Sequence, residues 1–137
     1  VYIWVADAGD SAASKFPALV RLDDNLSIST AMRLSFSNYS HQLCCLNING
    51  AGDRLFYYDN GVFTMSVSSN TLQPAMLING DNKNVYVMAV DANNDDIYLS
   101  DDLDFIQSSR IYRYDNSGLL IQSFTAGIIT GYFTFDE

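Results

Sequence analysis

Two long acidic stretches carry the side chains of this sequence that could bind a ligand. They run from Asp7 to Pro17 and from Ser100 to Ser109, and both read as loops between strands. Functional side chains often lie on long loops that a rigid scaffold holds in place. The alternative is that these loops only pack against neighbouring repeats. The candidate ligand-binding residues are Asp7, Asp10, Lys15, Phe16, Asp101, Asp102, Asp104, Phe105 and Gln107.

The second stretch also offers carboxylate oxygens, which are the ligands that Ca²⁺ prefers in proteins. Asp101, Asp102 and Asp104 would supply them. Asp residues are equally at home in turns, where their side chains accept hydrogen bonds from the backbone. We therefore expect no cofactor and no metal, with calcium at these three residues as the weaker alternative.

The sequence offers little support for catalysis. His41 is the only histidine and has no Ser–His–Asp context, so we interpret it as structural. Paired carboxylates could serve as the acid and base of a glycosidase, but adjacent loop positions do not establish the separation that this chemistry needs. No glycine-rich phosphate loop occurs. We expect no catalytic residue and a protein that is not an enzyme.

Cys44 and Cys45 are the two cysteines, and they are adjacent. Neighbours in a strand point to opposite faces, so a disulfide between them would be strained. The spacing does not match a metal-binding knuckle. We interpret both as small hydrophobic residues of a buried strand.

The composition predicts one folded all-β domain. Of the 137 residues, 48% are hydrophobic and 13% aromatic, enough for a core, and no helical periodicity is visible. The net charge of −9 argues against nucleic acid and against an anionic membrane surface, because both are met by Lys and Arg. No apolar run is long enough for membrane insertion. The chain starts at Val1, so we expect a removed leader or a piece of something longer.

Residues 84–127 set the pattern for the whole chain. They read as four short strands, at 84–90, 96–100, 110–114 and 119–124, separated by turns rich in Asp, Asn, Ser and Gly. Four antiparallel strands in about 40 residues are typical of one blade of a β-propeller.

Two weaker copies of this repeat precede it. Residues 42–80 align as a second blade, whose outermost strand holds Pro74, a residue that suits an edge strand. Residues 2–36 match only the last three strands, and a lone strand at 131–135 would complete that blade. Because rings need about four to eight blades, three blades predict a fragment, the remaining blades being separate, or self-association of two copies into six.

The last third of the chain resembles a known family. Asp101, Asp104 and Phe105 match an acidic loop, residues 112–115 a "YRYD" strand and turn, and residues 127–133 a "GII-G-F" closing strand. These motifs are similar to the C-terminal part of YVTN/NHL-like β-propellers in surface lipoproteins of gut-commensal Gram-negative bacteria. The resemblance implies a seven-bladed ring tethered outside the cell, and some members capture small ligands such as cobalamin.

Taken together, the sequence predicts a non-enzymatic, extracytoplasmic binding module at the outer-membrane surface or in the periplasm. It would display loops on a propeller scaffold to a small ligand or a protein partner. The first alternative is a propeller-type lyase or hydrolase, and the second is a structural scaffold in a surface complex.

Overall fold

Eleven strands and no helix make up the part of the chain that the computed structural model describes, residues 2–27 and 31–136. The described residues therefore contain no helix that could cross a membrane. The all-β class expected from the composition is confirmed. The strands are β1 (Tyr2–Asp7), β2 (Ala18–Asp23), β3 (Met32–Ser35), β4 (Cys44–Ile48), β5 (Arg54–Tyr58), β6 (Gly61–Ser66), β7 (Ala75–Asn79), β8 (Val85–Val90), β9 (Ile97–Asp101), β10 (Ser108–Tyr114) and β11 (Leu120–Ile128).

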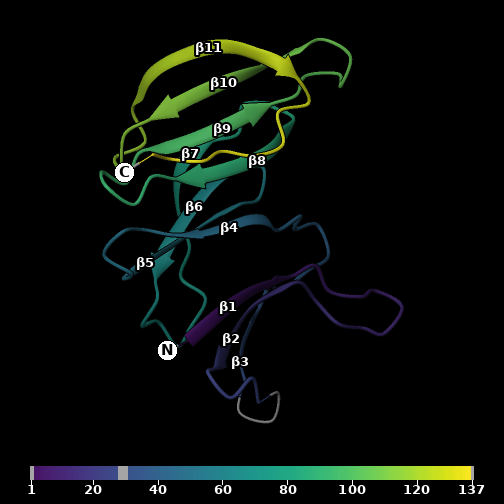
Figure 1. The fold of residues 1–137 in the computed structure, drawn as a ribbon. Coiled ribbons are helices and arrows are strands. Elements are labelled where there is room, and N and C mark those ends of the chain that lie inside the picture. Colours follow the sequence, from purple (N-terminus) through teal and green to yellow (C-terminus); the bar gives the residue numbers. More distant parts are fainter. Residues whose placement is uncertain (1, 28–30, 137) are drawn as a thin grey trace.

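The strands form three separate antiparallel sheets, each with its strands hydrogen-bonded in chain order. The first sheet holds β1–β3, the second β4–β7 and the third β8–β11. They follow one another through the molecule from the first sheet at the bottom of Figure 1 to the third at the top, and they do not close into a ring. β7 begins directly after Pro74 and is an edge strand, as expected for a residue without a backbone donor.

The second sheet is buried on both faces, and β5 shows why. Alternate side chains of a strand point to opposite faces. Leu55 and Tyr57 pack toward the first sheet, whereas Phe56 and Tyr58 pack toward the third. Every residue of β5 after Arg54 is buried. This explains why the sequence of this strand is a continuous apolar run rather than an alternating one.

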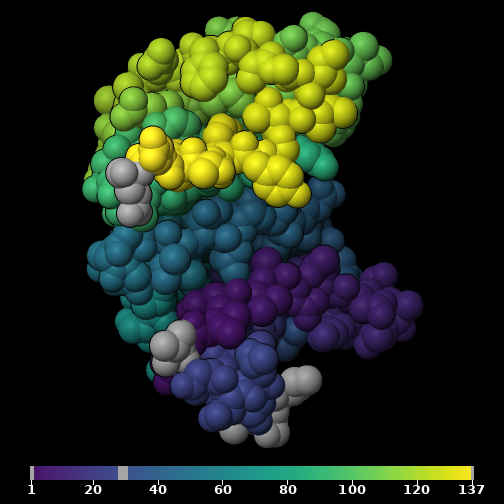
Figure 2. All heavy atoms as spheres, viewed as in Figure 1, coloured from purple at the N-terminus to yellow at the C-terminus, as the bar shows by residue number. Residues whose placement is uncertain are grey.

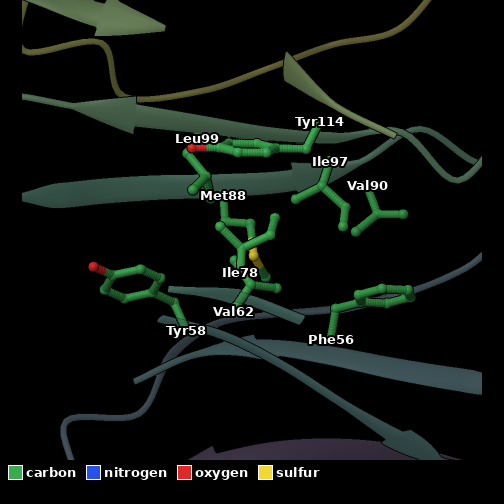
Figure 3. Close-up of a cluster of buried hydrophobic side chains, with 9 residues drawn as sticks. All are labelled: Phe56, Tyr58, Val62, Ile78, Met88, Val90, Ile97, Leu99 and Tyr114. Carbon is green, nitrogen blue, oxygen red and sulfur yellow. The ribbon is translucent and has the colours of Figure 1, made fainter. Parts of the chain in front are cut away.

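The core between the second and third sheets is the larger of the two clusters that hold the stack together (Figure 3). Leu99 and Ile97 of β9 face Phe56 and Tyr58 of β5 across it. Burial of each such side chain stabilises the fold by about 1.5–3 kcal/mol. The complete cluster is Phe56, Tyr58, Val62, Ile78, Met88, Val90, Ile97, Leu99 and Tyr114.

Polar contacts join the second and third sheets at the turns opposite the long loops. The carboxylate of Asp95 accepts hydrogen bonds from the backbone N–H of Gly50 (3.1 Å) and from Asn49 Nδ2 (3.2 Å). Gly50 lies so close to the backbone of Ala92 that a Cβ there would overlap the Ala92 carbonyl oxygen. The two turns are therefore locked together.

The closing strand expected at residues 131–135 is not formed. Residues 131–136 belong to no sheet, and they lie over the third sheet (Figure 2). Phe133 and Phe135 contact the ring of Tyr98, with 5.8 and 5.1 Å between ring centres. The first sheet lies at the other end of the stack, below the second sheet in Figure 1. The aromatic tail therefore packs on the nearest aromatic surface instead of pairing with β1. Of the strand expected within 26–36, residues 28–30 lie outside the described residues.

Candidate functional site

The short β5–β6 and β7–β8 connections, together with the longer β3–β4 connection, surround a groove on one side of the stack, and Ala8 of the first long loop also lines it. A hollow of about 510 Å³ lies between the β3–β4, β5–β6 and β7–β8 connections. A neighbouring hollow of about 420 Å³ shares Tyr58, Asn60 and Lys83 with it. We call the two together the loop-face groove. Its polar wall is formed by His41, Gln42, Asn60, Asn79, Asp81, Asn82, Lys83 and Asn84.

Left-handed backbone conformations shape this groove. Asn60 (φ 52°) forms the tight β5–β6 turn, and Asp81 (φ 46°) and Asn82 (φ 59°) form the β7–β8 turn. Asn and Asp adopt this conformation more readily than other non-glycine residues. Gly80 allows the two turns to touch, because a Cβ on it would overlap the carbonyl oxygen of Asn60. The wall of the groove is therefore preformed.

Three carboxamide side chains of the groove have spare hydrogen-bonding capacity. Gln42, Asn60 and Asn82 are exposed, and their side chains make no hydrogen bond to any residue that the structure describes. Each amide can donate two hydrogen bonds and accept two. The groove thus offers donors and acceptors to a ligand without breaking existing contacts.

Lys83 brings a cation to the groove. Its side chain is only 13% exposed, and its Nζ lies 3.8 Å from Asp81 Oδ2 and 5.1 Å from the centre of the Tyr112 ring. The distance to Asp81 is too long for a strong hydrogen bond, and Asp81 itself is largely solvated. Lys83 therefore remains able to attract an anionic group.

His41 is fixed at the edge of the groove by a buried carboxylate. Its Nδ1 lies 2.6 Å from Asp59 Oδ2, and the other oxygen of Asp59 accepts a hydrogen bond from the backbone N–H of Gln42 (2.9 Å). The ring also packs on Phe36, with 4.3 Å between ring centres. Sequence reasoning treated His41 as isolated, since Asp59 is 18 residues away. The pair holds Gln42 in place beside the groove.

The two cysteines are not arranged as neighbours in a regular strand. Cys45 has a positive φ of 57°, and the pairing of β4 with β5 shifts register between Cys44 and Asn47. Their Sγ atoms are 3.0 Å apart, so both side chains lie on the same side, and both are half-buried rather than buried. The expectation of opposite faces is wrong, because a left-handed residue breaks the alternation of the strand.

The hydrogen bond between the two thiols makes them unequal. It raises the pKa of Cys44, which burial raises further, and it lowers the pKa of Cys45. Cys44 is the thiol that lines the loop-face groove, so the thiol facing the groove is protonated at neutral pH. Since a thiolate is the reactive form, Cys44 is poorly suited to act as a nucleophile with His41.

The first long loop uses its candidate residues to hold itself together. Asp7 forms ion pairs with Arg33 (2.5 Å) and Lys15 (3.1 Å), and the Arg33 hydrogen bond holds the pKa of Asp7 well below its ordinary value. Asp10 accepts hydrogen bonds from two backbone N–H groups of its own turn. Phe16 packs on Tyr39 with 4.6 Å between ring centres. This cluster borders an apolar groove of about 670 Å³ on the outer face of the first sheet, lined by Val5, Val20 and Leu22.

The second long loop, at the upper right of Figure 1, is built in the same way. Asp101 accepts hydrogen bonds from the backbone N–H groups of Asn84 and Leu103. Asp104 accepts from the side chain and backbone of Gln107, which lowers the pKa of Asp104 to about 2. The ring of Phe105 meets that of Tyr86 edge-on at 6.3 Å.

Asp102 is the exception within that loop because its side chain is fully buried. Its Oδ1 accepts hydrogen bonds from the hydroxyls of Ser100 and Ser109, both at 2.6 Å, and Oδ2 has no partner among the described residues. Both serines are also fully buried. Asp102 therefore ties β9 to β10 at the base of the loop, and its side chain is not exposed to solvent.

The structure does not bring the three calcium candidates together. Asp101, Asp102 and Asp104 each serve different backbone or side-chain donors. Across residues 2–27 and 31–136, no three His, Cys, Asp or Glu side chains gather as a metal site would require.

Comparison with known proteins adds no family assignment, since no protein-family model and no curated protein matches the chain. The resemblance to YVTN/NHL-like propellers therefore stays a prediction. Sequence reasoning placed the candidate residues on the long loops and named none on the connections at 38–42, 60–61 and 79–84. The signal for them was the asparagines at Asn60, Asn79, Asn82 and Asn84.

Proposed function

We propose that this chain is a non-enzymatic binding module whose loop-face groove takes a small, hydroxyl-rich molecule such as a sugar or a sugar acid. The observation that carries the proposal is the set of exposed, unpaired amides of Gln42, Asn60 and Asn82 around a preformed groove. The larger hollow, at about 510 Å³, falls within the range of about 300–1,000 Å³ that is common for small-molecule sites.

The chemistry of the groove favours hydroxyl groups. A carboxamide both donates and accepts, as a hydroxyl does, so neighbouring hydroxyls of a ligand can each find a partner. Lys83 adds one cation within reach of the same amides. We therefore expect a sugar acid, whose carboxylate can pair with Lys83 Nζ, to bind more tightly than the corresponding neutral sugar.

The scaffold that we propose is a propeller exposed outside the cytoplasm. Three consecutive antiparallel meanders packed face to face support it. The edge strands β4 and β8 are also neighbours, joined by a hydrogen bond from Asn47 Nδ2 to the Met88 carbonyl (3.1 Å). First strands that meet near one axis are typical of propeller blades. The extracytoplasmic location rests on the family resemblance alone.

The lyase or hydrolase alternative is the weaker one. The His41–Asp59 pair could orient a general base, but a second catalytic group must face it. Cys44, a nucleophilic side chain that lines the groove, has a raised pKa. A scaffold role would instead use the outer face of the first sheet, where Ile3 and Val5 are 43% and 41% exposed.

Calorimetric titration with glucose, N-acetylglucosamine and glucuronate tests the proposed function. The Asn60→Gly and Asn82→Gly substitutions remove the amides while suiting the left-handed backbone. Together they should weaken binding by about tenfold or more, since each amide hydrogen bond contributes about 0.5–1.5 kcal/mol. Lys83→Met should remove the preference for glucuronate.

The matched control is Asn93→Ala, an exposed asparagine in the β8–β9 turn at the other end of the strands. It should leave the affinity unchanged. Absence of binding by all three probes, or equal weakening by the control, would overturn the proposed ligand class.

A further inference from the structure

The adjacent thiols of Cys44 and Cys45 lie close enough to react with one another. Their Sγ atoms are 3.0 Å apart, which is shorter than the van der Waals contact distance between two unbonded sulfur atoms. The positive φ of Cys45 and the register shift of β4 produce this arrangement. A regular strand would have separated the two side chains to opposite faces. The backbone thus brings both thiols to one place.

This pair is open to small reagents. Both cysteines are half-buried, and Cys44 forms part of the wall of the loop-face groove. The other thiol lies toward the edge strand β8, with Cys45 Sγ 3.8 Å from the carbonyl oxygen of Tyr86. Cys44 therefore faces the groove, and Cys45 faces the edge strand β8.

We propose that Cys44 and Cys45 form a redox-active dithiol that is oxidised to a disulfide between adjacent residues by a low-molecular-weight disulfide. The site does not depend on the identity of the ligand that the groove binds. It adds a modification site to a wall of that groove.

The reaction balances as two thiol–disulfide exchanges. The thiolate of Cys45 attacks one sulfur of the small disulfide, forms a mixed disulfide and expels one small thiolate. Cys44 then gives its proton to that thiolate or to solvent, and its sulfur attacks Cys45 Sγ and expels the second small thiolate. Two electrons pass from the cysteine pair to the reagent, which ends as two thiols.

The roles of the two sulfurs follow from their environments. The Cys44 thiol and the backbone at Met88 both stabilise an ionised Cys45, so its pKa is lowered and Cys45 attacks first. Cys44 has a raised pKa and keeps its proton until the mixed disulfide has formed. In redox-active dithiols, the thiol with the lower pKa usually attacks first, while its partner remains protonated.

The bond would be reversible rather than structural. The Cα atoms of adjacent residues are about 3.8 Å apart across a trans peptide, closer than the roughly 4.4–6.8 Å at which disulfides are relaxed. Such a bond is strained and more easily reduced than an ordinary structural disulfide. Since Cys44 lines the groove, oxidation would also alter the surface that a ligand meets.

Intact-mass analysis of the full chain after incubation with oxidised glutathione tests this proposal. The native chain should lose two hydrogen atoms without retaining glutathione, and dithiothreitol should restore both thiols to alkylation by iodoacetamide. Cys44→Ser should retain one glutathione, because nothing resolves the mixed disulfide. Cys45→Ser should react more slowly than Cys44→Ser.

The native chain alone is decisive if a variant does not fold. A stable glutathione adduct on the native chain, a disulfide between two chains, or no reaction at all would each overturn the proposal. Circular dichroism of the variants before oxidation distinguishes a chemical effect from loss of the fold.

Discussion

The long loops and the short connections at the same side of the stack use their polar residues in opposite ways. In the long loops, Asp7, Asp102 and Asp104 accept hydrogen bonds from Gly9, from Ser100 and Ser109, and from Gln107 of their own loop or its base. In the short connections, Asn60 and Asn82 have side chains without partners among the described residues. The sequence predicted a ligand site in the long loops because of their length. The asparagines of the short connections are the better candidates, because their amides have spare hydrogen-bonding capacity.

The difference has a physical origin. A long connection has many backbone groups to satisfy, and nearby carboxylates are efficient acceptors for them. The tight β5–β6 turn satisfies its backbone within the hairpin, where the Asp59 N–H donates to the Gly61 carbonyl (2.9 Å), and this leaves the Asn60 side chain free. Acidic residues in long loops are therefore better evidence for loop structure than for a ligand site.

The largest expected effect is a loss of stability when the buried carboxylate of Asp102, at the base of the second long loop, is removed. Asp102→Ala would leave the buried hydroxyls of Ser100 and Ser109 without their acceptor. We expect the free energy of unfolding to fall by about 3 kcal/mol or more, measured by urea denaturation. The matched control is Asp104→Ala in the same loop, which should cost much less because Asp104 is exposed. Equal losses of unfolding free energy in the two variants would contradict the distinction between the buried Asp102 and the exposed Asp104.

A smaller effect is expected where two short connections touch. Gly80→Ala would force apart the turns that contain Asn60 and Asn82, because its Cβ overlaps the Asn60 carbonyl. We expect a loss of about 2 kcal/mol in unfolding free energy and weaker ligand binding. Gly127→Ala provides the comparison, as nothing lies within 4 Å of a Cβ there. If Gly80→Ala bound the ligand normally, the groove would not depend on this contact.

The ion pairs of the first long loop should appear in the acid dependence of stability. The pKa of Asp7 is lowered in the folded state by its hydrogen bond to Arg33, relative to about 3.9 in the unfolded chain. Ionised Asp7 therefore adds stability above about pH 4, and that stability is lost as the pH falls below this value.

Both Asp7→Asn and Arg33→Met should flatten this part of the profile, measured by urea denaturation between neutral and acid pH. Because Asp7 and Arg33 are partly solvated, the change should be modest. An acid slope that persists in both variants would assign it to other carboxylates.

Much of the fold could be predicted from the sequence. The β-branched and aromatic residues of segments such as Tyr2–Asp7 and the unbroken apolar run of β5 locate strands, and Pro74 correctly indicates an edge strand. The structure establishes three open antiparallel sheets. The closed, seven-bladed ring that the family resemblance implies stays a prediction. The tail at 131–135 has the composition of a strand. Strand pairing also requires the edge of a sheet within reach, and composition does not show whether such an edge is near.

The site was less predictable because it depends on contacts between distant residues. Nothing local in the sequence joins His41 to Asp59, or shows that Asp102 is buried while Asp104 is exposed. The left-handed conformation of Cys45 is also invisible, since cysteine is not a residue that favours it. Asn60 and Asn82 were visible as turn formers, but whether their amides are occupied is decided by the fold.

The most direct test of this account maps ligand binding onto the backbone by NMR, using glucuronate and the uniformly ¹⁵N-labelled chain. We predict that the amide signals that shift on titration cluster at residues 41–44, 59–61 and 79–84. Shifts confined to residues 8–16 and 103–107 would contradict the central claim, because the long loops would then form the binding surface and the short connections only the scaffold.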